Sequence, residues 1–91
     1  MTEVQVEQRE HKDDVYVFAV RVDGNIYRVR CSDDYYRMLT ESKIDPEQLV
    51  EKSFVFLLER EPASSILSEF DLPLISNYFP EYESTIKRMV G

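Results

Sequence analysis

Residues 15–23 and 26–31 alternate between two kinds of side chain with a period of two, which is typical of half-buried β-strands. One face of both strands is mainly aromatic and β-branched: Tyr16, Phe18, Val20, Val22, Tyr27, Val29 and Cys31. The opposite face mixes small or aliphatic residues with arginines: Val15, Val17, Ala19, Arg21, Ile26, Arg28 and Arg30. We therefore expect the first face to pack on the core and the second to point away from it.

The segment 23–25, Asp-Gly-Asn, predicts a tight antiparallel turn between these strands, because glycine and asparagine tolerate positive φ. Two registers fit. A turn at 24–25 would set Arg21 directly opposite Arg28, whereas a turn at 23–24 removes this opposition. Directly opposed like charges are destabilising, so the turn at 23–24 is favoured.

A further strand is indicated before the hairpin. In residues 2–10, Val4 and Val6 alternate with polar neighbours but supply little apolar surface, which is typical of an edge strand. Residues 11–14, His-Lys-Asp-Asp, would form the polar loop that joins this strand antiparallel to the hairpin. Because two strands alone are rarely stable in water, we expect a three-strand meander.

The hydrophobic period changes to a helical one after residue 31. Ser32 is suited to cap a short helix that contains two tyrosines and Leu39. A clearer start follows at Asp45, where proline occupies the first helical position and glutamine the third, and this helix should run to about Arg60. Its apolar positions lie on more than one side, which predicts a central helix or one that meets a second subunit.

Three shorter helices are expected in the rest of the chain, at about 64–70, 73–79 and 81–90, separated by prolines and an aspartate. No repeat or long linker divides the chain. The sequence therefore predicts one α+β domain over residues 1–91, with strands in 1–31 and packed helices in 32–91.

The chain of 91 residues carries 11 basic and 18 acidic residues, a net charge of -7. Residues 32–91 hold six of these negative charges, and this balance works against general attraction to phosphate backbones or anionic lipid. No secretory signal and no membrane-spanning apolar run is recognised, and a single cysteine cannot form an internal disulfide. We expect a cytoplasmic protein that is not bound to membranes.

Catalytic, cofactor and metal sites find little support. The single histidine, His11, lies in a charged segment, and the single cysteine, Cys31, lies on the apolar strand face, where a thiol is usually inert. One cysteine and one histidine do not make a structural zinc site, and no glycine-rich phosphate loop is present. We expect no catalytic residue, no cofactor and no metal ligand, and hence a protein that is not an enzyme.

The arginine-bearing strand face is the first candidate for a binding surface. Arg21, Arg28 and Arg30 could bind an anion or a partner protein, or nucleic acid as an alternative. Exposed aromatic residues for base stacking are missing from this face, so nucleic acid is the less favoured partner. The favoured interpretation is that Glu3 or Glu7 on the neighbouring strand, or an acidic helix, neutralises the arginines.

Apolar residues that the rest of the chain does not cover are the second candidate. If several of the following are exposed together they would mark an interface, since contiguous apolar patches are uncommon on monomers: Val15, Val17, Ala19, Phe56, Tyr78 and Phe79. A symmetric dimer would bury one such patch twice. The sequence therefore predicts a protein-interaction module or a homodimer, with Val15, Val17 and Phe56 at the interface.

The C-terminal half of the chain carries one resemblance. Residues 46–62, together with Phe-Asp-Leu-Pro at 70–73 and Tyr-Phe-Pro-Glu-Tyr-Glu at 78–83, resemble small uncharacterised prokaryotic proteins. This resemblance implies no activity and assigns no residue a role.

Overall fold

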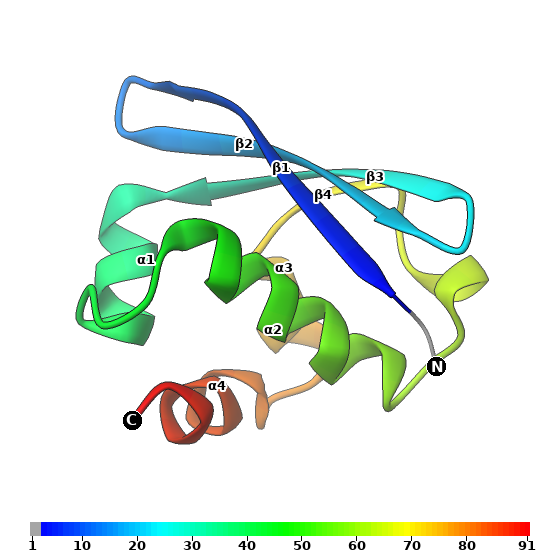
Figure 1. Cartoon of the computed structure of the whole chain (residues 1–91). Helices are drawn as coiled ribbons and strands as arrows, with labels where there is room; N and C mark the ends of the chain where they lie inside the picture. The colour runs from blue at the N-terminus through cyan, green and yellow to red at the C-terminus, as the bar shows by residue number, and fades with distance from the viewer. Residues whose placement is uncertain (1–2) are drawn as a thin grey trace.

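Four strands form one sheet in the order β1-β2-β3-β4, in a computed structural model that describes residues 3–91 (Figure 1). The strand bounds are β1 Val4–Lys12, β2 Val15–Val22, β3 Asn25–Ser32 and β4 Glu69–Asp71. The first three strands make the antiparallel meander that the sequence predicts, with β1 at the edge. The predicted beginning of β1 at Thr2 lies outside the described residues.

The turn between β2 and β3 lies at Asp23 and Gly24, which confirms the favoured register: Arg21 faces Ile26, and Arg28 faces Ala19. The preceding connection is shorter than expected. β1 continues to Lys12, and the 13–14 turn consists of two aspartates with φ of 53° and 61°. The predicted polar loop over 11–14 is therefore wrong. Residues 11 and 12 pair with β2 and extend β1, so the turn contains only residues 13 and 14.

β4 was not expected. The segment 64–70 is not a helix: a short 3-10 helix, η1 (Ala63–Ser65), is followed by extended chain that pairs parallel to β3. Phe70 is buried between two exposed acidic residues, and its ring packs 6.1 Å from that of Phe54. The burial of Phe70 stabilises this strand. With only three residues, β4 is too short for its alternation of polar and apolar side chains to be recognised in the sequence.

The helices are α1 Asp33–Thr40, α2 Pro46–Leu58, α3 Leu74–Tyr78 and α4 Tyr82–Val90. Both predicted starts are confirmed. The Ser32 hydroxyl accepts a hydrogen bond from the backbone N–H of Tyr35 at 3.1 Å, and the Gln48 side chain accepts one from that of Asp45 at 2.8 Å. Within residues 3–91, no helix is both long enough and apolar enough to cross a membrane.

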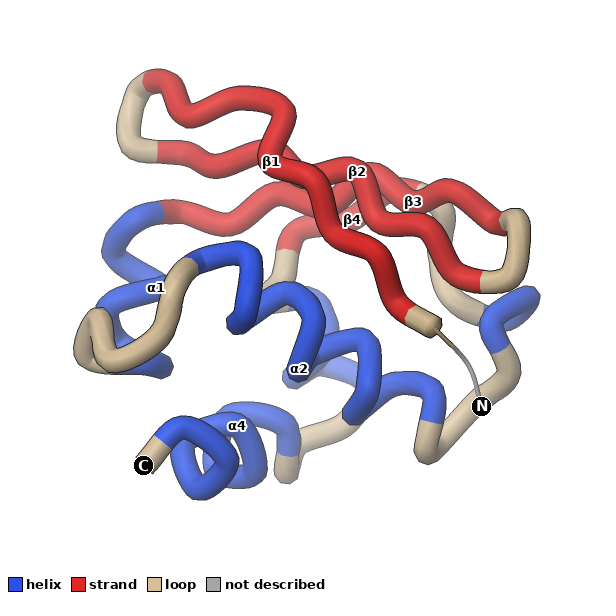
Figure 2. Tube along the Cα trace, viewed as in Figure 1, coloured by secondary structure: helices blue, strands red, loops and turns tan. Residues whose placement is uncertain are grey.

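All four α-helices lie on one side of the sheet, and α2 runs between the sheet and α4 (Figures 1 and 2). The second apolar side of α2 is therefore covered by the chain itself. The Phe56 ring lies 5.9 Å from that of Phe79 and 5.2 Å from that of Tyr82, and the Arg60 guanidinium stacks 3.5 Å above it. Phe56 is 0% exposed, so the prediction that it lies at an interface is wrong, and it belongs to the core.

Candidate functional site

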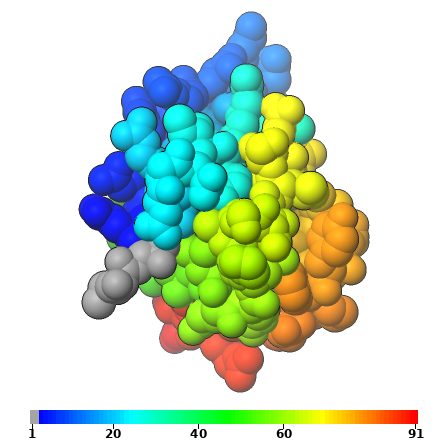
Figure 3. Space-filling view, turned by 90° about the vertical axis from the view of Figure 1, so that its right-hand side faces the viewer, coloured from blue at the N-terminus to red at the C-terminus, as the bar shows by residue number. Residues whose placement is uncertain are grey.

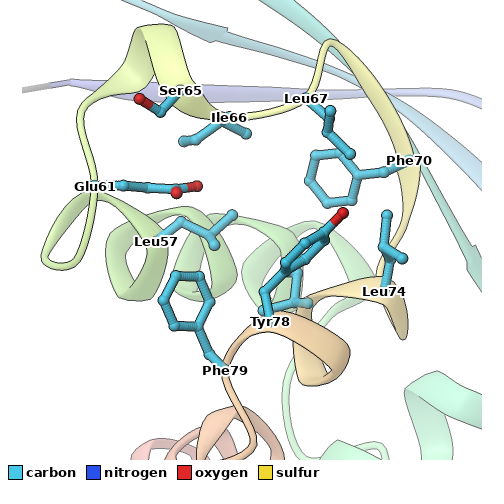
Figure 4. A pocket seen from close by; sticks show the side chains of 10 residues that line it. Leu57, Glu61, Ser65, Ile66, Leu67, Phe70, Leu74, Tyr78 and Phe79 are labelled. Carbon is cyan, nitrogen blue, oxygen red and sulfur yellow. The ribbon is translucent and has the colours of Figure 1, made fainter.

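An apolar groove of about 330 Å³ opens where α2 ends, between η1, the approach to β4, and α3 (Figure 4). In the space-filling view these segments, coloured yellow-green to orange, lie next to one another on one face of the molecule (Figure 3). The groove is lined by Leu57, Glu61, Ser65, Ile66, Leu67, Phe70, Leu74, Ile75, Tyr78 and Phe79.

Prolines and short elements produce this hollow. Pro62 cannot continue α2, so the chain turns away from the helix end and returns toward the sheet through η1. Pro73 then precedes α3, which is only five residues long. These short segments pack around the end of α2 and surround a space near Leu57 that no side chain of residues 3–91 fills.

The floor and the rim of the groove differ in exposure. Leu57, Ile66 and Ile75 are buried in the core and form the floor. On the rim, Leu67 is 49% exposed and Tyr78 is 65% exposed. Large exposed apolar side chains around a hollow, continuous with the core, are typical of a binding surface.

Among residues 3–91, Glu61 is the one charged residue that lines the groove, and its carboxylate points into it (Figure 4). It is half-buried, and within residues 3–91 no basic group lies within 4.0 Å of it. The neighbouring Arg60 is engaged elsewhere: it contacts Glu81 at 3.2 Å and Glu59 at 3.7 Å. The groove therefore combines an apolar floor with an acidic group that has no counter-ion in the described chain.

The outer face of the sheet is a second candidate surface. No helix of residues 3–91 lies on it (Figure 2). Val15, Val17 and Ala19 are half-buried along β2, and Ile26 on β3, the partner of Arg21, is 62% exposed. The structure thus leaves the predicted interface residues Val15, at the start of β2, and Val17 partly accessible on this face.

Two of the three arginines on this outer face are paired. Arg30 contacts Asp71 at 2.7 Å and Glu69 at 3.3 Å, and Arg28 contacts Glu69 at 3.7 Å. The hydrogen bond from Arg30 to Asp71 raises the pKa of the guanidinium. The sequence predicts that Glu3, Glu7 or an acidic helix neutralises these arginines. The carboxylates that pair with Arg28 and Arg30 come from β4 instead.

Arg21 differs from the other two. Its strand neighbours are Gln5 and Ile26, and among residues 3–91 no carboxylate lies within 4.0 Å of it. Of the three predicted arginines, Arg28 and Arg30 are thus neutralised by β4, and among residues 3–91 Arg21 has no carboxylate partner.

Cys31 and His11 lie on the core face of the sheet, on either side of Tyr16. The thiol is 2% exposed, as predicted, and burial raises its pKa to about 12, with smaller contributions from Asp33 and Asp71. The His11 ring stacks on Tyr16 at 3.8 Å. Within residues 3–91, no group of three potential ligands is placed to hold a metal ion.

The sequence pattern identifies only part of the groove. It singles out Tyr78 and Phe79 as apolar residues that would mark an interface if exposed, and both line the groove. It does not single out Leu67, which falls in a predicted helix, or Glu61, which is one of many carboxylates.

No family model matches the chain, and the searches of curated proteins and of solved structures found no significant match either.

Proposed function

We propose that this protein is a small protein-interaction module that holds an apolar side chain of a partner in the groove between α2, η1 and α3. The observation that carries this proposal is the open groove itself, with exposed Leu67 and Tyr78 above a floor of core residues. Its volume of about 330 Å³ is near the lower end of the range for ligand pockets, enough for one large side chain rather than a whole cofactor.

The floor makes this groove suited to binding. Leu57, Ile66 and Phe70 are held by the core, so they lose little conformational freedom when a ligand enters. Burial of apolar surface contributes about 25 cal/mol per Å², and a fully buried Leu or Phe side chain about 1.5 to 3 kcal/mol. A single anchor in this groove would therefore support a weak, reversible interaction.

Selection from a library of displayed short random peptides tests the proposal even though the partner is unidentified. Enriched peptides would be synthesised, and their affinities measured by fluorescence anisotropy. Leu67→Asp should abolish most of the binding, because it places a charge on the rim of the groove. Met38→Asp is the matched control: Met38 has similar exposure, 43%, but lies on α1 outside the groove.

Two outcomes would contradict the proposal. One is that selection enriches no peptide that binds the purified protein. The other is that Leu67→Asp and Met38→Asp reduce affinity equally, since binding would then not depend on the groove.

Self-association through the outer sheet face is a second candidate, and the pattern of charge across the strands favours it. Two cross-strand rows each run from an acid on β1, through a small or aliphatic residue on β2, to an arginine on β3: Glu7-Ala19-Arg28 and Glu10-Val17-Arg30. We also propose that two copies pack these faces together.

A two-fold axis parallel to the strands would place β1 of one copy over β3 of the other. Glu10 would then lie above the second copy's Arg30, while Val17 would meet its own counterpart at the centre. Face-to-face sheets pack in this near-aligned manner. The same patch is thereby used twice, and Glu10 of one copy would join Glu69 and Asp71 of the other copy around its Arg30.

The nucleic-acid alternative is less favoured. Arg28 and Arg30 share their charge with Glu69 and Asp71, which reduces the attraction of this face for phosphate. The net charge of -7 opposes it further.

A further inference from the structure

We propose that the partner segment carries lysine or arginine beside its apolar anchor, and that Glu61 selects it by pairing with that cation. This inference rests on the proposed function and adds the chemistry of the ligand. An apolar side chain would occupy the floor around Leu57 and Phe70, and the adjacent basic group would meet the Glu61 carboxylate at the end of the groove.

The position of Glu61 is the first reason. Its carboxylate points into an apolar hollow, where an approaching ligand displaces water and the effective dielectric falls. A ligand that brings no cation would leave this carboxylate partly desolvated and unpaired, which is unfavourable. A ligand with a lysine or arginine at this point would compensate the loss with a charge-assisted hydrogen bond.

The end of α2 is the second reason. Helix C-termini carry partial negative charge, and the last turn of α2 itself contains no basic residue. The Arg60 that follows donates to the Phe56 carbonyl at 3.0 Å and to Glu81, which directs it toward α4. Arg60 thus offsets part of the charge of the helix end but pairs with Glu59 and Glu81 rather than with Glu61, so the Glu61 carboxylate remains available to a cation of the ligand.

The charge of the surrounding chain is the third reason. The part of the chain from residue 32 onward carries six net negative charges, and it supplies every residue of the groove. Such a field accelerates the approach of a basic segment and disfavours an acidic one. The same field disfavours insertion of Leu67 and Tyr78 into an anionic lipid surface.

Three synthetic peptides would test the inference, each with one central tryptophan and identical length, flanked by lysine, glutamine or glutamate. Their affinities are measured by fluorescence anisotropy at low and at high salt. The lysine peptide should bind about 3- to 10-fold more tightly than the glutamine peptide at low salt, and the glutamate peptide more weakly than either. Salt should reduce the difference.

Glu61→Gln should remove the preference for lysine, by weakening the lysine peptide and by strengthening the glutamine peptide, which no longer desolvates an unpaired carboxylate. Glu61→Lys should invert the preference. Glu59→Gln is the matched control: it changes the net charge equally at a residue outside the groove lining, and it should preserve the preference.

The ways in which this test can fail are distinguishable. If all three peptides bind equally and Leu67→Asp abolishes their binding, the groove binds apolar side chains and the charge inference is wrong. If Glu61→Gln and Glu59→Gln weaken the lysine preference equally, general charge rather than Glu61 is responsible, and the inference is also wrong. If none of the peptides binds, both the inference and the proposed function are contradicted.

Discussion

The hydroxyl groups of Ser53 and Tyr82 meet at 2.6 Å in the interior between α2 and α4. Ser53 donates to the Leu49 carbonyl at 2.8 Å, which leaves its oxygen free to accept from the tyrosine. Both buried hydroxyls are thereby satisfied, and burial raises the pKa of Tyr82. This pair links the two helices at a defined position beside Phe56.

Cys31 provides a prediction about pH at the residue scale. Burial raises the pKa of its thiol from 9.0 to about 12, so between these values the unfolded chain has lost a proton that the folded chain retains. Stability should therefore be unaffected below pH 9 and should fall as pH rises through this window, by up to about 1.4 kcal/mol per pH unit for this group.

Urea denaturation at a series of pH values, for the wild type and for Cys31→Ala, measures this effect. The variant is less stable at neutral pH because it loses packing, but its stability should decline less steeply above pH 9. Burial is the largest cause of the raised pKa of Tyr35 and Tyr82, and Cys31 adds to it, so the difference in slope reports the thiol together with its coupling to these two tyrosines. Parallel curves would show that Cys31 does not titrate as its burial implies.

At the scale of elements, the connection between β1 and β2 offers a second prediction. Asp13 and Asp14 both have positive φ, a conformation that suits asparagine and glycine better than aspartate, and they place two like charges side by side. Replacing both residues, Asp13→Asn with Asp14→Gly, should stabilise the protein by about 0.5 to 1 kcal/mol.

The midpoint of thermal or urea unfolding checks this change. Asp34→Asn provides a contrast: it removes one carboxylate from the first turn of α1, where a carboxylate is favourable, and should lower the midpoint. An unchanged or lowered midpoint for the turn variant would mean that the aspartates make stabilising contacts in this turn.

The elements differ in how well local sequence predicts them. α2 begins where a proline and a glutamine follow Asp45, and the β2–β3 register follows from a single glycine and a pair of arginines. β4 has no comparable signal. Its formation depends on the packing of Phe70 against Phe54 and on backbone hydrogen bonds with β3, and the residues involved lie far apart in the chain.

At the scale of the whole molecule, the prediction concerns association. Light scattering across micromolar concentrations should approach twice the monomer mass of 10.8 kDa for the wild type. Val17→Glu should return the mass to that of the monomer without loss of helical or strand signal in circular dichroism, because it places a carboxylate at the centre of the outer sheet face.

Val55→Glu is the matched control. Val55 is 41% exposed but lies on α2, away from the outer sheet face, so this variant should still associate. A constant monomer mass for the wild type over the whole range would exclude the dimer. Equal dissociation of both variants would show that the dimer contact does not depend on the outer face of β2.

The sequence by itself determined the features that depend on neighbouring residues. The period of two separates the core face of β2 and β3 from the outer face, the 23–24 turn sets their register, and capping residues start α1 and α2. These features follow from backbone conformation and local alternation. The burial of Cys31 follows from the same alternation.

Only the tertiary structure decided which surfaces remain open. Phe56 is covered because α4 and Arg60 reach it, and the arginines at 28 and 30 are neutralised because β4 joins the sheet beside them. The groove around Leu57 exists because short segments meet the end of α2 without filling it. Each of these depends on contacts between distant parts of the chain, which no local pattern specifies.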